Sequence, residues 1–315
     1  MRRRYFEVSA VAGLILAVLS MGLAAADPVR VPGTKVSLQP PPGFSPADKF
    51  PGFQRAELQA SIMVTELPAP AADMMKAMTK EGLASRGMTL LSSQTEKVDG
   101  RDALLLHVAQ TAAGTEYLKW LLVTGDAETS LLIAGIFPKS TEAELGAAIR
   151  GSVLTASFKA DAASDPWEGL GFRVTPTPKL KLAGRISNLL MLTESGSTGP
   201  LGPTEPLYIV GNSIGHPAVG DLRSFSEERA RQTEHLQDLQ GFSGRALEVD
   251  GMAAYELLAT GKDTKKGTAV RLYQVIAAEE DGYFIMQGLV SAERGDEMLP
   301  EFRHLTGSFR RTAGE

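Results

Sequence analysis

The chain has 315 residues, and its 32 Lys and Arg against 37 Asp and Glu give a formal net charge of −5 at pH 7. Binding to a nucleic-acid backbone needs clustered positive charge, so we expect no nucleic-acid partner. The chain contains no cysteine, which excludes disulfides, a thiolate nucleophile and cysteine-ligated metals.

The first 26 residues have the pattern of an export signal. Arg2–Arg4 form a basic start, Val8–Leu23 is uncharged and mostly apolar, and Ala24–Ala26 are the small residues of a cleavage site. We expect cleavage before Asp27, and a periplasmic or secreted protein with no stable membrane span afterwards. A retained anchor is the alternative, and the paired arginines also leave open twin-arginine rather than ordinary export.

Residues 32–158 predict one α+β unit. A helix is expected at 72–86, from its apolar spacing, and another at 141–152, where Thr141 and Glu144 form a capping-box pattern. Asp99-Gly100 is a hairpin signal. The expected strands are 35–39, 53–57, 61–67, 89–98, 103–111, 117–124 and 130–137.

Residues 159–166 are small, polar and end in proline, as in a short linker. Residues 167–309 then repeat the same order of elements. Helices are expected at 224–239, capped by Ser224, and near 296–304, where Pro300 predicts a shortened helix. The expected strands are 172–175, 188–192, 207–210, 244–249, 253–259, 268–277 and 283–290, with a Gly/Pro/Ser/Thr insertion at 195–206.

The repetition is visible in short landmarks that match between the copies. Val98-Asp99-Gly100 recurs as Val249-Asp250-Gly251, and the ending 154–158 recurs as 305–309, both at an offset of 151. Gly135 matches Gly288 at an offset of 153. The turns between successive strands are too short for crossovers, so each sheet should be largely antiparallel. The sequence therefore predicts an α+β fold in two tandem copies, each a sheet with packed helices.

These landmarks resemble a known group of exported domains. Pro42-Gly43-Phe44 after a short strand, the Val-Asp-Gly turn, the meander and the final helix closing on Ser-Phe are similar to the photosystem II extrinsic protein PsbP and to periplasmic DcrB-type proteins. The resemblance covers both copies. It implies a non-enzymatic accessory or binding domain, and it supplies no site residues.

One catalytic pattern occurs in the second copy. Gly211-Asn212-Ser213-Ile214-Gly215 matches the G-x-S-x-G nucleophile elbow, with His216 and Asp221 nearby. That motif requires a helix that begins directly after the serine. Here Pro217 follows, and a helix is expected only from Ser224, so we interpret the segment as a strand end and loop. A serine hydrolase that uses Ser213 is the alternative function.

The other candidate residues give only weak indications of a functional site. The four histidines have no metal-ligand spacing, and His107 is expected to face outward from its strand while His235 and His304 lie in helices. The other groups considered are Met74, Met75 and Met78, read as a packed helical face, the acidic turn 279–281, and the basic hairpin tip with Lys262, Lys265 and Lys266. No catalytic, cofactor-binding or metal-binding residue is assigned. The sequence predicts a non-catalytic binding or accessory protein of the bacterial cell envelope, with a protein or small ligand as partner.

Overall fold

The computed structural model describes residues 27–112, 114–159, 165–198, 204–215 and 217–312. The predicted export signal, residues 1–26, lies outside the described residues, as do most of the predicted linker and His216. No helix in the described ranges has the length and apolar character needed to cross a membrane.

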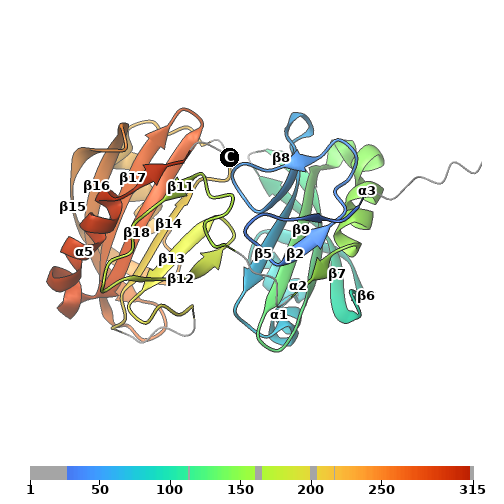
Figure 1. Ribbon diagram of the computed structural model, residues 1–315, viewed down its shortest axis with the longest axis horizontal. Helices are drawn as coiled ribbons and strands as arrows, with labels where there is room; N and C mark the ends of the chain where they lie inside the picture. The colour runs from blue at the N-terminus through green and yellow to red at the C-terminus, as the bar shows by residue number, and fades with distance from the viewer. Residues whose placement is uncertain (1–26, 113, 160–164, 199–203, 216, 313–315) are drawn as a thin grey trace, which may run out of the picture.

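Two seven-stranded antiparallel sheets form the molecule, in two lobes that lie side by side (Figure 1). The first sheet has the order β3-β4-β5-β9-β8-β7-β6 and the second β12-β13-β14-β18-β17-β16-β15. The strands of the first are β3 (Ser45–Pro46), β4 (Gly52–Arg55), β5 (Ala60–Leu67), β6 (Met88–Val98), β7 (Arg101–Ala112), β8 (Thr115–Gly125) and β9 (Ser130–Pro138). Those of the second are β12 (Lys181–Ile186), β13 (Leu189–Thr193), β14 (Leu207–Asn212), β15 (Leu236–Val249), β16 (Met252–Asp263), β17 (Ala269–Glu279) and β18 (Gly282–Ser291).

The identical strand order confirms the predicted α+β fold in two copies. Short strands add to each copy: β1 (Val29–Arg30), β2 (Val36–Leu38) and β10 (Ser157–Phe158) form one small sheet, and β11 (Phe172–Arg173) pairs with β19 (Arg310–Arg311). The helices are α1 (Ala71–Ala77), α2 (Lys80–Ala84), α3 (Glu142–Leu154), α4 (Leu222–Arg231) and α5 (Gly295–Gly307). Single 3-10 turns, η1 (Ala56–Leu58), η2 (Lys139–Thr141) and η3 (Ala292–Arg294), complete the described elements.

The repeated Asp-Gly turn has a second task besides reversing the chain. Asp99 and Asp250 take positive φ angles of 52° and 49°, and each is followed by a glycine with positive φ. The carboxylate of Asp99 accepts a hydrogen bond from the backbone N–H of Phe158 at 3.0 Å, and that of Asp250 accepts one from Arg311, also at 3.0 Å. These bonds hold the pKa of each carboxyl below its usual value. The hairpin tip is thus tied to the end of its copy, which is why the two landmarks recur together.

The repeated glycine lets a helix approach the sheet closely. A Cβ added at Gly135 in β9 would lie 2.2 Å from Cγ2 of Ile149 in α3, and one at Gly288 in β18 would lie 2.6 Å from the Phe302 ring in α5. Beneath α3 and α5 lie the two largest apolar cores, one in each copy. The sheet and its C-terminal helix therefore form the same packed layer twice.

Several predicted helix limits are wrong. The expected helix 72–86 is split into α1 and α2, because the side chain of Thr79 caps a new helix by accepting from the N–H of Gly82. The helix expected at 224–239 begins at Leu222 with Asp221 as its cap and ends at Arg231. His235 follows it with φ 65°, outside any helix, and the chain then enters β15.

The closing helices also differ from expectation. Thr141 forms no capping bond to α3 and instead donates its hydroxyl to the carbonyl of Pro138. Helix α5 has 13 residues and holds Pro300 in its interior, so the predicted shortening is wrong. Pro300 has no N–H to donate within the helix, and the burial of Met298, Phe302 and Leu305 on the sheet offsets the cost of that lost bond.

The two lobes meet through a small number of polar contacts. The side chain of Glu168 pairs with Arg30 and accepts from the N–H of Gly33, and Lys49 donates to the carbonyl of Asp281 at 2.6 Å. Arg185 donates to the carbonyl of Glu168, and its burial lowers its pKa to about 10, against the opposite influence of nearby carboxylates. These contacts lie at the end of the second sheet that carries the β17–β18 turn.

Candidate functional site: an open apolar sheet face

Ser213 lies directly after β14 and is bound by backbone. Its N–H donates to the carbonyl of Tyr283 at 2.8 Å, its hydroxyl oxygen accepts from the N–H of Tyr283 at 3.1 Å, and the hydroxyl donates to the carbonyl of Gly215 at 3.3 Å. The next helix, α4, begins only at Leu222. The strand–turn–helix geometry that exposes an elbow serine is therefore missing from the described part of this segment.

We predict that Ser213 gives no covalent product with a fluorophosphonate probe. A reactive serine needs a base within hydrogen-bond reach and aligned N–H groups at a helix start, whereas this hydroxyl is used to join β14 to β18. Mass spectrometry of probe-treated protein checks the expectation, with Ser213→Ala as the control. Labelling that disappears in Ser213→Ala would favour the hydrolase.

Most of the other candidate residues from the sequence take part in packing or in secondary structure. Met74, Met75 and Met78 pack on the first sheet as predicted, although Met78 lies between α1 and α2 and not on a helix. His107 does not face outward: it stacks on Trp120 with ring centroids 4.1 Å apart, and burial lowers its pKa. Its Nε2 is buried without a hydrogen-bond partner in the part of the chain that the structure describes. His304 lies on α5 as expected. No group of three or more potential metal ligands occurs within the described residues.

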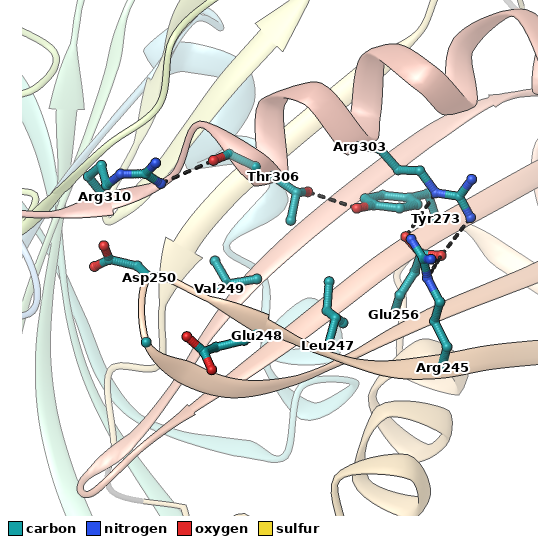
Figure 2. Close-up of a pocket in the computed structure, with 12 residues that line it drawn as sticks. Arg245, Leu247, Glu248, Val249, Asp250, Glu256, Tyr273, Arg303, Thr306 and Arg310 are labelled. Carbon is teal, nitrogen blue, oxygen red and sulfur yellow. Dashed lines mark hydrogen bonds and ion pairs between the residues drawn. The ribbon is translucent and has the colours of Figure 1, made fainter.

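A charged hollow of about 530 Å³ lies between α5 and the β15–β16 hairpin (Figure 2). At its centre Glu256, only 2% exposed, accepts from Nε of Arg303 at 2.9 Å, from Nη2 of Arg303 at 2.6 Å and from Nε of Arg245 at 3.2 Å. Burial alone would raise the pKa of Glu256, but the two guanidinium groups hold it below its usual value. Beside it Tyr273 donates to the hydroxyl of Thr306.

The charges in this hollow already have partners. Glu256 is engaged by two arginines, Asp250 by Arg311, and Arg310 by the carbonyls of Gly307 and Phe309. Because Glu256 joins Arg303 of α5 to Arg245 of β15, the cluster holds α5 on the sheet. The register places Glu256 where Leu105 stands in the first copy, and sequence alternation alone gives no sign that this carboxylate is buried.

A larger hollow, of about 780 Å³, lies on the opposite face of the second sheet. Successive side chains of a strand point to opposite faces, so β13, β14 and β18 each present alternate residues here while their neighbours enter the core under α5. We call this surface the second-sheet groove. Its floor contains Leu189, Leu207, Ile209, Ile285, Gln287 and Leu289.

The groove exists because one helix covers this face incompletely. In the first copy α1 lies on β8 and β9, and α2 lies on β6. In the second copy the single helix α4 packs mainly on β15, β16 and β17, and only its start reaches Ile285 in β18. No helix among the described residues lies over β14 or the outer part of β18, and Leu207, Ile209 and Leu289 remain only partly buried there.

Strand β14 of the groove floor is more apolar than β5 at the corresponding place in the first copy, whereas β18 has Gln287 where β9 has Ala134. Ile62 pairs with Gly135 in the first sheet as Tyr208 pairs with Gly288 in the second, which aligns the two registers. On this alignment the second copy has Leu207 in place of Ser61 and Ile209 in place of Met63. Leu207 and Ile209 of β14 are the floor residues that distinguish the copies, and sequence analysis missed them.

Polar groups close one side of the groove. The buried amide of Gln287 donates to the hydroxyl of Thr233 at 2.9 Å and to the side-chain oxygen of Gln274 at 3.1 Å, and Gln274 in turn donates to the carbonyl of Ser226 at 2.8 Å. This chain of bonds fixes the end of α4 to the sheet. The groove wall is therefore built in advance of any ligand, as small-molecule sites usually are.

No protein-family model matches the chain, and no curated protein matches it. The immunity protein TplEi of the T6SS from Pseudomonas aeruginosa is 12% identical with a TM-score of 0.34, and the match covers 91% of this chain and 98% of that one. LpqN, involved in cell envelope biogenesis of Mycobacterium tuberculosis, is 14% identical with a TM-score of 0.32, covering 45% of this chain and 83% of its own.

Cyanobacterial PsbP from Synechocystis sp. PCC 6803 is 9% identical with a TM-score of 0.28, covering 50% of this chain and 98% of its own. A PsbP structure is thus among the structures similar to this chain. Similarity at this level assigns neither a family nor a function, so the function is argued from the groove.

Proposed function

We propose that this protein is an exported, non-catalytic binding protein of the bacterial cell envelope, and that its second domain holds an apolar ligand in the second-sheet groove. The observation that carries the proposal is the uncovered face of β14 and β18. A contiguous apolar surface with a few fixed polar groups is the usual character of a ligand site. The PsbP- and DcrB-like domain pattern of the sequence agrees with an accessory role.

The binding proposal is tested with the neutral fluorescent dye N-phenyl-1-naphthylamine, which brightens in apolar sites. We expect Ile209→Glu to weaken dye binding by more than about ten-fold, because the new carboxylate would be desolvated by an apolar ligand. The matched control is Met63→Glu at the corresponding position of the first copy, which should leave binding unchanged. Equal binding by all three proteins would exclude the groove as the site.

Export is proposed from the first 26 residues of the sequence. We expect the protein recovered from the cell envelope to begin at Asp27, because small residues at 24–26 end the apolar run. N-terminal sequencing checks this expectation. A chain that still begins at Met1 in the membrane fraction would show instead that the segment is kept as an anchor.

A further inference from the structure

We propose that the second-sheet groove takes a fatty acid, with the carboxylate at the end formed by the β16–β17 hairpin and the hydrocarbon tail running toward the first domain. The inference rests on the proposed function and adds the chemistry of the ligand. Its basis is the unequal character of the two ends of the groove.

The two ends are set by strand direction. Val270 at the start of β17 pairs with Ser291, and Glu279 at its end pairs with Gly282. Residues 264–268 therefore lie at one end of the groove, and the β17–β18 turn, which contacts the first domain through Lys49, lies at the other. On the floor, Leu207 to Gly211 spans about 13 Å at the usual rise of a strand, so an extended chain fits along it.

The hairpin end carries cations that form no ion pair within the described residues. Lys265 and Lys266 line the groove, and neither ammonium group has an ion-pair partner in the ranges that the structure describes. Arg229, on the last turn of α4, reaches the same hollow; its Nη1 donates to Gln232, and its Nε is buried without a hydrogen-bond partner among the described residues. A buried guanidinium N–H that lacks an acceptor can be satisfied by an ordered water or by an anion, and an anion gives the stronger bond.

Three carboxylates also line the groove, and two of them accept hydrogen bonds from backbone N–H groups. Asp263 accepts from the N–H groups of Lys265 and Lys266 at 3.0 and 2.7 Å, which fixes the hairpin with both lysine side chains free of it. Glu205 accepts from the N–H of Ser195 at 3.0 Å. Glu234 is the third. The opposite end contains Leu189, which is partly exposed, and Ile285, which is largely buried under the start of α4. An anionic head with one apolar tail matches this order of polar and apolar surface.

The test measures displacement of N-phenyl-1-naphthylamine by dodecanoate and by dodecan-1-ol, which share a chain and differ in the head group. Dodecanoate should compete about ten-fold more strongly, and 0.5 M NaCl should reduce the difference. Lengthening the acid should tighten binding about four-fold for each methylene until the groove is filled. Lys265→Glu/Lys266→Glu should remove the advantage of the acid and leave the alcohol unchanged, whereas Lys76→Glu/Lys80→Glu on α1 and α2 makes the same change of charge and should have no effect.

Each outcome is decisive. If acid and alcohol compete equally and the hairpin variant changes nothing, the fatty-acid inference is wrong while the groove remains a ligand site. If dodecyl phosphocholine competes as strongly as dodecanoate, a net anionic head is not what the groove selects, and the inference also fails. If the dye itself does not bind, the proposed function fails. If sedimentation shows a dimer whose formation excludes the dye, the groove is covered by a second copy and no fatty acid site exists.

Discussion

Replacing Arg303 by alanine should lower the free energy of unfolding of the second domain by about 3 kcal/mol at pH 7, because it removes the two-pronged partner of a buried carboxylate. Glu256 is only 2% exposed, and after the change it would keep only the single 3.2 Å bond from Arg245. Calorimetry of the full chain, with the two domains as separate transitions, measures the loss. The transition of the first domain is the internal reference.

The sign of the pH dependence follows from the lowered pKa of Glu256. A carboxyl whose pKa is depressed by folding stabilises the native state above its unfolded pKa of about 4.3, and this contribution is lost as the pH falls through the folded value. The difference between the wild-type protein and Arg303→Ala should therefore shrink below pH 4. Glu256→Leu, which restores the residue type of Leu105 in the first copy, should be nearly neutral. A loss of 3 kcal/mol in that variant would contradict this explanation.

Gly288→Ala should destabilise the second domain by about 2–3 kcal/mol, since the added methyl would lie within 2.6–2.7 Å of the Phe302 ring and force α5 or the ring to move. Gly135→Ala should affect the first domain in the same way through Ile149. The matched control is Gly151→Ala on α3, where nothing lies within 4 Å of the new Cβ and a small gain from helix propensity is expected. Equal behaviour of Gly288→Ala and Gly151→Ala would show that the helix does not need this close approach.

Much of the architecture could be predicted from short-range signals. Positive φ at the Asp-Gly turns and close contact at Gly135 and Gly288 restrict the residue type, so these positions stay recognisable in both copies. The order of strands and helices follows from turn signals of the same kind. The predicted helix ends are less accurate, because neighbouring residues can also serve as caps. The sequence alone does not show that Thr79 and Asp221 are the residues that cap α2 and α4.

The candidate site could not be predicted in the same way. Leu207 and Ile209 belong to the continuous apolar run 207–210, which is typical of a strand buried on both faces, and the position of α4 leaves them uncovered by any described helix. Glu256 shares a strand face with the apolar residues Met252, Ala254 and Leu258, and its partner Arg303 lies 47 positions away in the sequence.

The most direct measurement of the central claim is an amide spectrum of the ¹⁵N-labelled protein during titration with sodium dodecanoate. We expect saturable shifts at Leu207–Asn212 of β14, at 285–291 of β18 and at Lys265 and Lys266, with β5 and β9 of the first copy unchanged. Shifts confined to the first sheet or to the hollow around Glu256, or none at all, would contradict the account.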